Sequence, residues 1–311
     1  MRFPIIDTHC DTISEVLSKN KSLRKNDMHI DLERLENYPQ YTQFFACFSD
    51  PVYRAGALSH CLAVVDRLYR EMERNSDKAA LCRRYAEIEE CRQQGKTAAV
   101  LSLEGGEPIE SMAALRILYG LGVRCIALTW NYSNHLAAGV LEPDPARGLT
   151  AFGRQALAEM ERLGIMADVS HFNDRSFWDL AAVYKKPIIA THSNARAVCA
   201  HPRNLTDAQF LKIRETGGCV GINLYPVFLR QDGPANITDI IRHIEHFMAL
   251  GGEDSVGIGA DFDGVDALPV GIRGVEDLEK IFDALAQIGY PDQLLEKIAY
   301  KNFERVLEIC L

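Results

Sequence analysis

Residues 164–194 read GIMADVSHFNDRSFWDLAAVYKKPIIATHSN and contain a complete strand–helix–strand unit. Two short apolar runs, Ile165–Val169 and Pro187–Thr191, have the composition of strands that are buried on both faces. Between them, Ser176–Tyr184 has the apolar spacing of an amphipathic helix. Parallel strands joined by a helix are the repeating unit of α/β folds, so this stretch predicts a parallel sheet covered by helices.

The same alternation extends over the whole chain, and eight strands each followed by a helix predict a (β/α)8 TIM-type barrel. We expect residues 1–311 to form this single domain, with long βα loops at 20–41 and 131–150 and an extra C-terminal helix at 291–311. An open doubly wound sheet is the alternative, but no GxGxxG, GxxxxGK[ST] or GxSxG motif supports it. The remaining predicted strands are Pro4–Asp7, Thr42–Phe48, Ala98–Leu103, Val123–Thr129, Gly218–Asn223 and Ser255–Ala260. The remaining predicted helices are Ala57–Arg74, Ala79–Gln94, Ile109–Gly120, Ala151–Leu163, Ala208–Glu215, Ile237–Ala249 and Val275–Gly289.

Composition narrows the class of protein further. The 311 residues are 47% hydrophobic and 25% charged, with a formal net charge of -9. An acidic chain lacks the basic footprint that nucleic acids and anionic membranes require, so neither is expected as a partner. No apolar signal region or apolar stretch of membrane-spanning length is found, and the nine scattered cysteines form no CxxC pair. We therefore expect a cytoplasmic protein with reduced cysteines.

Metal-competent side chains stand directly after five of the predicted strands. In a barrel these strand ends converge on one rim, where three imidazoles and three carboxylates would be unstable together without bound cations. Nitrogen and oxygen donors without thiolates suit Zn²⁺, with Mn²⁺ or Co²⁺ as substitutes. Because the donors outnumber the ligands of one tetrahedral ion, we expect two ions with a bridging carboxylate. The residues are His9, Asp11, Glu104, His171, His192 and Asp261, of which Glu104 is the expected bridge.

Other histidines and acids carry alternative interpretations. Any single histidine at a strand end is commonly a hydrogen-bonded structural residue, and it is the joint placement that indicates metal. Asp7 and Asp168 can orient backbone or a ligand imidazole. His135 lies in the loop after the fourth strand and is a candidate for reaching the rim, whereas His243 is expected on a solvated helix face.

Six motifs, in this order and spacing, resemble the membrane (renal-type) dipeptidase family, a branch of the metal-dependent amidohydrolase superfamily. The resemblance covers essentially the whole chain and implies that His9 and Asp11 hold one zinc ion. It implies that His171 and His192 hold the other and that Glu104 bridges the two. The motifs are Asp7-Thr8-His9-Cys10-Asp11, Glu104-Gly105-Gly106, Asp168-Val169-Ser170-His171, Thr191-His192-Ser193-Asn194-Ala195, His201-Pro202-Arg203-Asn204 and Gly259-Ala260-Asp261-Phe262-Asp263-Gly264.

The resemblance also implies a dinuclear zinc dipeptidase. Its substrates would be dipeptides with a free C-terminal carboxylate, including L-Xaa-D-Xaa, and the nucleophile a hydroxide that bridges the metals. Asp261 would transfer the proton, Arg203 would bind the substrate carboxylate, and Tyr225 would line the pocket. Members of this family often dimerise, so a homodimer is one expected assembly.

One position departs from the family pattern. Animal members carry a histidine after the fourth strand that polarises the scissile carbonyl, and Trp130 stands there in this chain. The indole N–H can donate a hydrogen bond but cannot act as an imidazolium. Either His135 replaces that function or the metal carries the oxyanion. Two other functions remain open, because the same barrel and metals could hydrolyse another amide, a lactone or an ester, or could bind metal without catalysis.

Overall fold

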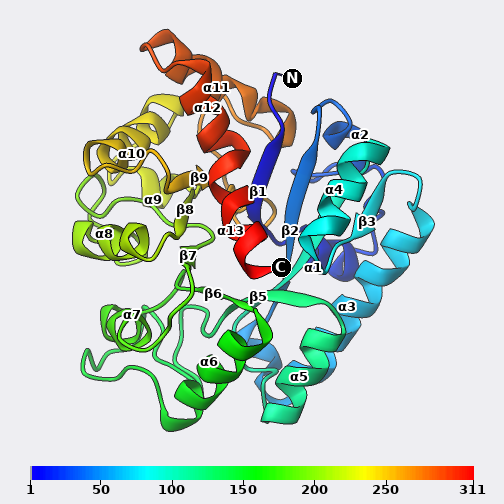
Figure 1. The fold of residues 1–311 in the computed structure, drawn as a ribbon, viewed down its shortest axis with the longest axis vertical. Coiled ribbons are helices and arrows are strands. Elements are labelled where there is room, and N and C mark those ends of the chain that lie inside the picture. Colours follow the sequence, from blue (N-terminus) through cyan, green and yellow to red (C-terminus); the bar gives the residue numbers. More distant parts are fainter. Residues whose placement is uncertain (1) are drawn as a thin grey trace.

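The computed structural model describes residues 2–311, which form a closed barrel of eight parallel strands (Figure 1). The barrel closes because β1 pairs with β2 and β9, and β2 pairs in turn with β4. The predicted TIM-type barrel is therefore confirmed, and each of the eight predicted strands is present. The barrel strands are β1 (Ile5–Cys10), β2 (Tyr41–Phe48), β4 (Thr97–Glu104), β5 (Val123–Ala127), β6 (Met166–Asp168), β7 (Ile188–Ala190), β8 (Cys219–Ile222) and β9 (Val256–Ile258).

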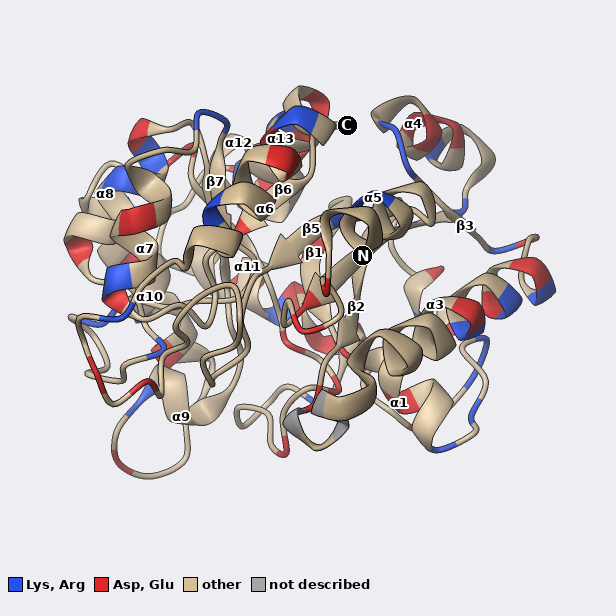
Figure 2. Cartoon of the chain, turned by 90° about the horizontal axis from the view of Figure 1, so that it is seen from below, with Lys and Arg blue, Asp and Glu red and all other residues tan. Residues whose placement is uncertain are grey.

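Helices surround this barrel, and local sequence sets their ends. The Thr150 hydroxyl accepts a hydrogen bond from the Gly153 N–H at the start of α6, and Gly164, with φ 83°, ends the same helix. Charges of both signs alternate along outer helices such as α3 (Figure 2). The helices are α1 (Thr12–Ser18), α2 (Leu32–Leu35), α3 (Ala57–Arg74), α4 (Tyr85–Gln94), α5 (Met112–Gly120), α6 (Ala151–Leu163), α7 (Asp174–Ala181), α8 (Asp207–Glu215), α9 (Pro226–Leu229), α10 (Ile237–Ala249), α11 (Glu279–Gln287), α12 (Asp292–Glu296) and α13 (Asn302–Cys310), with 3₁₀ turns at Pro51–Gly56 and Val275–Asp277 and a π turn at Lys297–Lys301.

A ninth strand, β3 (Ala79–Leu81), corrects the sequence prediction, which placed these residues at the start of a helix. It pairs with Thr97–Ala99 of β4, outside the barrel. That edge is available because β5 pairs with β4 only from Leu101 onward. Alanine and leucine favour helix locally, and only the free edge of a distant strand makes this segment extended.

The C-terminal helix closes the N-terminal end of the barrel, and α13 lies across the centre of the strands in Figure 1. Phe303 packs there among apolar side chains from the lower barrel, including Ile6 of β1 and Ile189 of β7. Gly257 on β9 makes room for the ring, since a Cβ at that position would lie 2.5 Å from Phe303 Cδ2. This end of the barrel is therefore an apolar core without access to solvent.

The nine cysteines are all free thiols. Eight of them are buried, and Cys310 is half-buried. Cys10 lies in the core, as its position between His9 and Asp11 on an extended strand predicts. Within residues 2–311, no helix combines the length and the apolar content needed to cross a bilayer.

Candidate metal centre

The C-terminal end of the barrel brings His9, Asp11 and Asp261 together. His9 Nε2 lies 3.3 Å from Asp11 Oδ2 and 3.7 Å from Asp261 Oδ1. Ligand atoms of these three buried residues lie within 4.8 Å of one another. His9 lies near the end of β1 and Asp11 directly follows the strand as the residue before α1, and the two side chains meet, as the sequence predicts.

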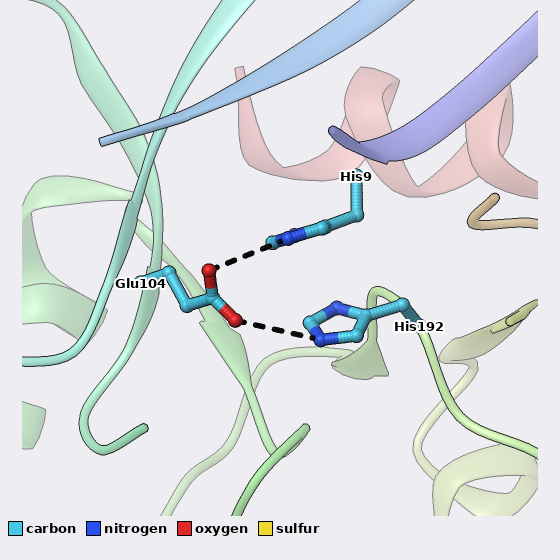
Figure 3. A group of neighbouring side chains, drawn as sticks. All are labelled: His9, Glu104 and His192. Atoms are coloured by element: carbon cyan, nitrogen blue, oxygen red, sulfur yellow. Dashed lines mark ion pairs between the residues drawn. The ribbon is translucent and has the colours of Figure 1, made fainter. Parts of the chain in front are cut away.

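The second half of the centre comes from the ends of β6 and β7. His171 Nε2 lies 2.9 Å from His192 Nε2 and 2.7 Å from Glu104 Oε1. The other Glu104 oxygen, Oε2, lies 3.4 Å from His9 Nε2. Figure 3 shows this carboxylate between the rings of His9 and His192, with one oxygen directed to each. Glu104 therefore contacts both halves, and the His9 and His192 rings also meet directly, with centroids 3.8 Å apart.

Hydrogen bonds fix the orientation of two ligand rings. His171 Nδ1 is 2.8 Å from Asn131 Oδ1, so it carries the proton and donates. Thr191 Oγ1 donates to Asp168 Oδ2 at 2.5 Å and lies 2.8 Å from His192 Nδ1, from which it accepts. Both rings therefore present an unprotonated Nε2 to the centre, the tautomer that binds a metal ion. Asp168 acts as an orienting residue, which was one of its two sequence interpretations.

Backbone strain coincides with these residues. His171 and Asp261 are non-glycine residues in the left-handed region, with φ of 71° and 62°. Each such conformation costs about 1–3 kcal/mol and persists only where surrounding structure imposes it. Gly264 contributes to the packing, since a Cβ there would lie 2.2 Å from Asp11 Oδ2 and 2.6 Å from Asp261 Oδ1. The chain therefore passes the acidic pair at a distance that only glycine permits.

The buried charges shift one another's proton affinities. Burial and the neighbouring Glu104 charge raise the pKa of Asp11 to about 8. Burial alone would raise the pKa of Glu104, but the His9 and His171 imidazoles hold it below its usual range. Burial and the Arg203 guanidinium lower the pKa of His171 to about 3. A cation at this site would stabilise the ionised carboxylates and the unprotonated imidazoles together.

The donor set fits divalent cations. Asp11 Oδ1 is buried without a hydrogen-bond partner. The unprotonated Nε2 atoms of His171 and His192 face each other across 2.9 Å, where neither can donate to the other. A cation relieves both conditions, and three imidazoles with carboxylates are ligands that Zn²⁺ accepts.

Arg203 lies beside the centre. Its Nη2 is 3.2 Å from His171 Nε2 and 3.3 Å from the His192 carbonyl oxygen, and its guanidinium stacks over Phe228. The side chain is 5% exposed, and its Nε has no hydrogen-bond partner. No carboxylate of residues 2–311 forms an ion pair with it. An anionic ligand would stabilise a guanidinium that is buried without an ion-pair partner.

A cavity of about 490 Å³ opens onto the centre. Asp11, Glu104, His171 and Asp261 form part of its wall. The remaining lining residues are Ser14, Glu15, Phe48, Asp50, Trp130, Asn131, Tyr225, Phe228, Asp263, Gly264, Val265 and Asp266.

Comparison with known proteins identifies the family of this chain. A model of the membrane dipeptidases, peptidase family M19, matches residues 1–310. The chain belongs to the membrane dipeptidase family. An uncharacterized dipeptidase of Schizosaccharomyces pombe is 34% identical over 311 residues, which cover 91% of this chain and 74% of the yeast protein.

Two crystal structures share the fold of this dipeptidase over nearly their entire lengths. A metallopeptidase of family M19, dipeptidase AC, has a TM-score of 0.92 at 31% identity, covering 100% of this chain and 99% of its own. A metallopeptidase of Rhodobacter sphaeroides, bound to a phosphinate mimic of the dipeptide L-Ala-D-Ala, has a TM-score of 0.91 at 30% identity, covering 99% of each chain. The protein is accordingly a metallo-dipeptidase, a hydrolase of peptide bonds.

The structure of the dipeptidase does not bring His135 to the cavity. The ring stacks on Phe152, and its Nε2 lies 2.9 Å from the Ile109 carbonyl oxygen. The loop therefore directs this side chain to the protein surface, and His135 does not stand in for the histidine missing at Trp130. Trp130 itself lines the cavity, with its ring centroid 6.1 Å from that of His171.

His243 also departs from its predicted position on a solvated face. It is fully buried, accepts a hydrogen bond from the Ala195 N–H at Nδ1, and donates from Nε2 to the Leu229 carbonyl oxygen at 3.0 Å. Burial lowers the pKa of this imidazole to about 4. In the dipeptidase it thus joins the segment after β7, which carries Arg203, to α9.

Sequence reasoning missed two asparagines of the site. Asn131 orients His171, and Asn223 donates from Nδ2 to Asp261 Oδ2 at 2.8 Å. Asn223 ends the predicted strand Gly218–Asn223 and Asn131 stands two residues after Val123–Thr129, so both lie at strand ends, the same signal that singled out the candidate metal ligands. An amide at a strand end was overlooked because it is a weak metal ligand, although it is well suited to fixing one.

Proposed function

We propose that the dipeptidase binds two Zn²⁺ ions, for which Mn²⁺ or Co²⁺ can substitute. His9 and Asp11 hold one ion, His171 and His192 the other, and Glu104 bridges them. The observation that carries the proposal is the division of the Glu104 carboxylate, whose Oε2 faces His9 while Oε1 faces the other two imidazoles. When bound, the ions supply a nucleophilic water at neutral pH and positive charge for the carbonyl oxygen.

Asp261 transfers the proton in this proposal. Its Oδ2 is held by Asn223, which leaves Oδ1 directed to the centre, 3.7 Å from His9 Nε2. Burial raises the pKa of Asp261, which suits a carboxylate that must take up a proton and release it again. It would accept the proton of the attacking water and deliver it to the leaving amine.

Arg203 binds the free carboxylate of the dipeptide. A guanidinium donates two parallel hydrogen bonds to a carboxylate, and this one lacks an anionic partner in the described chain. Its contact with His171 places the anchor within one residue's length of the reacting centre. That distance suits a single residue between the scissile bond and the free carboxylate. The complex of the R. sphaeroides relative with an L-Ala-D-Ala mimic supports a D-residue in second place.

Trp130 and Tyr225 contact the substrate in this proposal, because both line the cavity. Hydrolysis of another amide, a lactone or an ester would use the same metal centre but would not require Arg203. The two activities are therefore separated by the need for a substrate carboxylate.

Metal analysis combined with steady-state kinetics tests the proposal. Protein supplied with zinc should contain two ions per chain and hydrolyse L-Ala-L-Ala and L-Ala-D-Ala, with little activity on L-alanyl-L-alaninamide. Arg203→Met should abolish that preference for the carboxylate. Asp261→Asn should retain both ions and lose about 10²–10⁴-fold in kcat. One ion per chain, or equal rates on the amide and the acid, would refute it.

A further inference from the structure

We infer that the cavity selects dipeptides whose N-terminal residue carries a cationic side chain, such as lysine or arginine. The inference rests on the proposed function, which places the scissile bond at the metal centre and the substrate carboxylate at Arg203. It concerns residues that neither hold metal nor transfer protons.

The cavity wall is strongly acidic. Seven of its residues carry carboxylates, and no lysine or arginine is among the described residues that line it. Divalent ions at the metal centre would balance the negative charge of the carboxylates that face the imidazoles. The outer part of the wall keeps its negative charge. The seven are Asp11, Glu15, Asp50, Glu104, Asp261, Asp263 and Asp266.

Asp263 is already used by the fold. It accepts hydrogen bonds from the Thr12 hydroxyl at 2.5 Å and from the His29 N–H at 2.7 Å, which ties the loop after β9 to the segment before α2. This carboxylate is therefore a structural element of the wall rather than a contact for substrate.

Asp266 and Glu15 remain available to a ligand. Asp266 is exposed, and burial, together with the charge and a hydrogen bond of Asp266, raises the pKa of the Tyr225 phenol, which leaves the other carboxylate oxygen to a ligand. Glu15 is half-buried in the first turns of α1, where Lys19 on the solvent side is its ion-pair partner. A substrate cation that enters the cavity can compete with a flexible, exposed lysine for this carboxylate, since such surface pairs are weak.

The position of these two groups relative to the centre assigns them to the N-terminal residue. The Glu15 N–H bonds to the Asp11 carbonyl oxygen, so Glu15 lies one turn beyond a metal ligand. Asp266 belongs to the loop that begins at Asp261 and passes against Asp11 at Gly264. Both therefore stand on the Asp11–Asp261 side, away from the side where Arg203 contacts His171 and would bind the C-terminal carboxylate.

Aromatic side chains of the cavity wall also suit a cationic substrate side chain. The rings of Phe48, Trp130, Tyr225 and Phe228 line the same cavity, and Phe48 meets Trp130 edge-on with centroids 5.3 Å apart. A lysyl or arginyl side chain has an aliphatic stem that packs on such rings and a charged end that carboxylates and ring faces attract. An acidic side chain would meet only like charge.

The test compares kcat/KM for L-Lys-L-Ala with that for L-norleucyl-L-Ala, which has the same stem without the charge. We expect the zinc-loaded wild type to favour the lysyl substrate about 10-fold, a factor that falls as salt screens the exposed charges. Asp266→Asn and Glu15→Gln should each lower this ratio about 2–5-fold. Asp283→Asn and Glu73→Gln, which remove exposed carboxylates from α11 and α3, are the matched controls and should leave the ratio unchanged.

The outcomes separate the inference from the proposed function. Equal kcat/KM for the two substrates overturns the inference while the dipeptidase activity stands. Hydrolysis of neither substrate by protein with two bound zinc ions overturns the proposed function itself. An advantage for L-Ala-L-Lys over L-Lys-L-Ala would overturn the assignment of the acidic wall to the N-terminal residue. A ratio that falls equally in the control variants would overturn the roles of Asp266 and Glu15.

Discussion

The two ends of the barrel are built from the same strands and have opposite chemistry. On β1, Ile6 packs in the apolar lower barrel, and His9, three residues later, belongs to the metal centre. Likewise, Ile189 of β7 packs in the apolar lower barrel, and His192, three residues later, belongs to the metal centre. The apolar packing around Phe303 thus contrasts with the buried charges and left-handed backbone that lie three residues further along the same strands.

This difference shows how the fold tolerates its site. Burying apolar surface contributes about 25 cal/mol per Å² to stability, whereas burying unpaired charge opposes folding. The lower barrel and the helices therefore stabilise an upper rim that is unfavourable until cations bind. Conservative changes at the upper end should affect activity, and those at the lower end should affect stability.

The largest effect is expected for Glu104→Gln, which keeps the side-chain shape but removes the charge shared by both halves of the centre. Activity should fall about 10⁴-fold in kcat/KM, because metal assistance lowers the barrier to hydrolysis by several kcal/mol. Bound metal, counted by elemental analysis, should fall below two ions per chain. Glu110→Gln, on an exposed carboxylate of the same βα loop, is the control. Near-normal activity in Glu104→Gln would remove the bridge from the mechanism.

At the opposite end, Phe303→Ala should lower the free energy of unfolding by about 3–5 kcal/mol, as expected for a cavity in a packed core. Denaturant unfolding measures this loss, while kcat/KM at low temperature should change less than about 2-fold. Phe152→Ala, which truncates a half-buried ring outside the barrel, should cost much less. A large rise in KM for Phe303→Ala would show that the two ends are coupled.

The third prediction concerns His243, whose buried imidazole has a pKa of about 4 against an ordinary value of 6.5. The folded state holds this ring neutral, so its contribution to stability is complete above pH 6.5 and is lost as the pH falls towards 4. The loss is on the order of 3 kcal/mol for this shift. Unfolding free energies between pH 7 and pH 4 should fall less steeply for His243→Gln than for the wild type. Parallel pH profiles would show that acid acts elsewhere.

The smallest effect is expected for Asn223→Ala, which removes the hydrogen bond to Asp261 Oδ2. We expect kcat to fall about 10-fold with little change in KM, because one hydrogen bond to a charged group is worth about 1.5–3 kcal/mol and part of it is regained from water. The acid limb of the kcat profile should shift to higher pH, since the lost bond favours the ionised carboxylate. Asn37→Ala, at an exposed position, should have no such effect.

The strands, most helices and the meeting of imidazoles and carboxylates at the rim could be predicted because each depends on local pattern. Apolar runs of four to eight residues mark buried strands, and a polar residue directly after such a run lies on the rim of any parallel barrel. The features that could not be predicted depend on distant partners. Leu81 is extended because β4 has a free edge, and His243 is buried because Ala195 and Leu229 require its two nitrogens.

Sequence by itself determined the barrel, the set of imidazoles and carboxylates at its rim, and the resemblance to the dipeptidases. It did so because strand periodicity and strand-end chemistry are properties of neighbouring residues. Only the tertiary structure decided that Glu104 divides its oxygens between two groups of imidazoles, that His135 points away, and that Arg203 Nε is buried without a hydrogen-bond partner. Those facts depend on distances between residues far apart in the chain, which packing of the closed barrel alone sets.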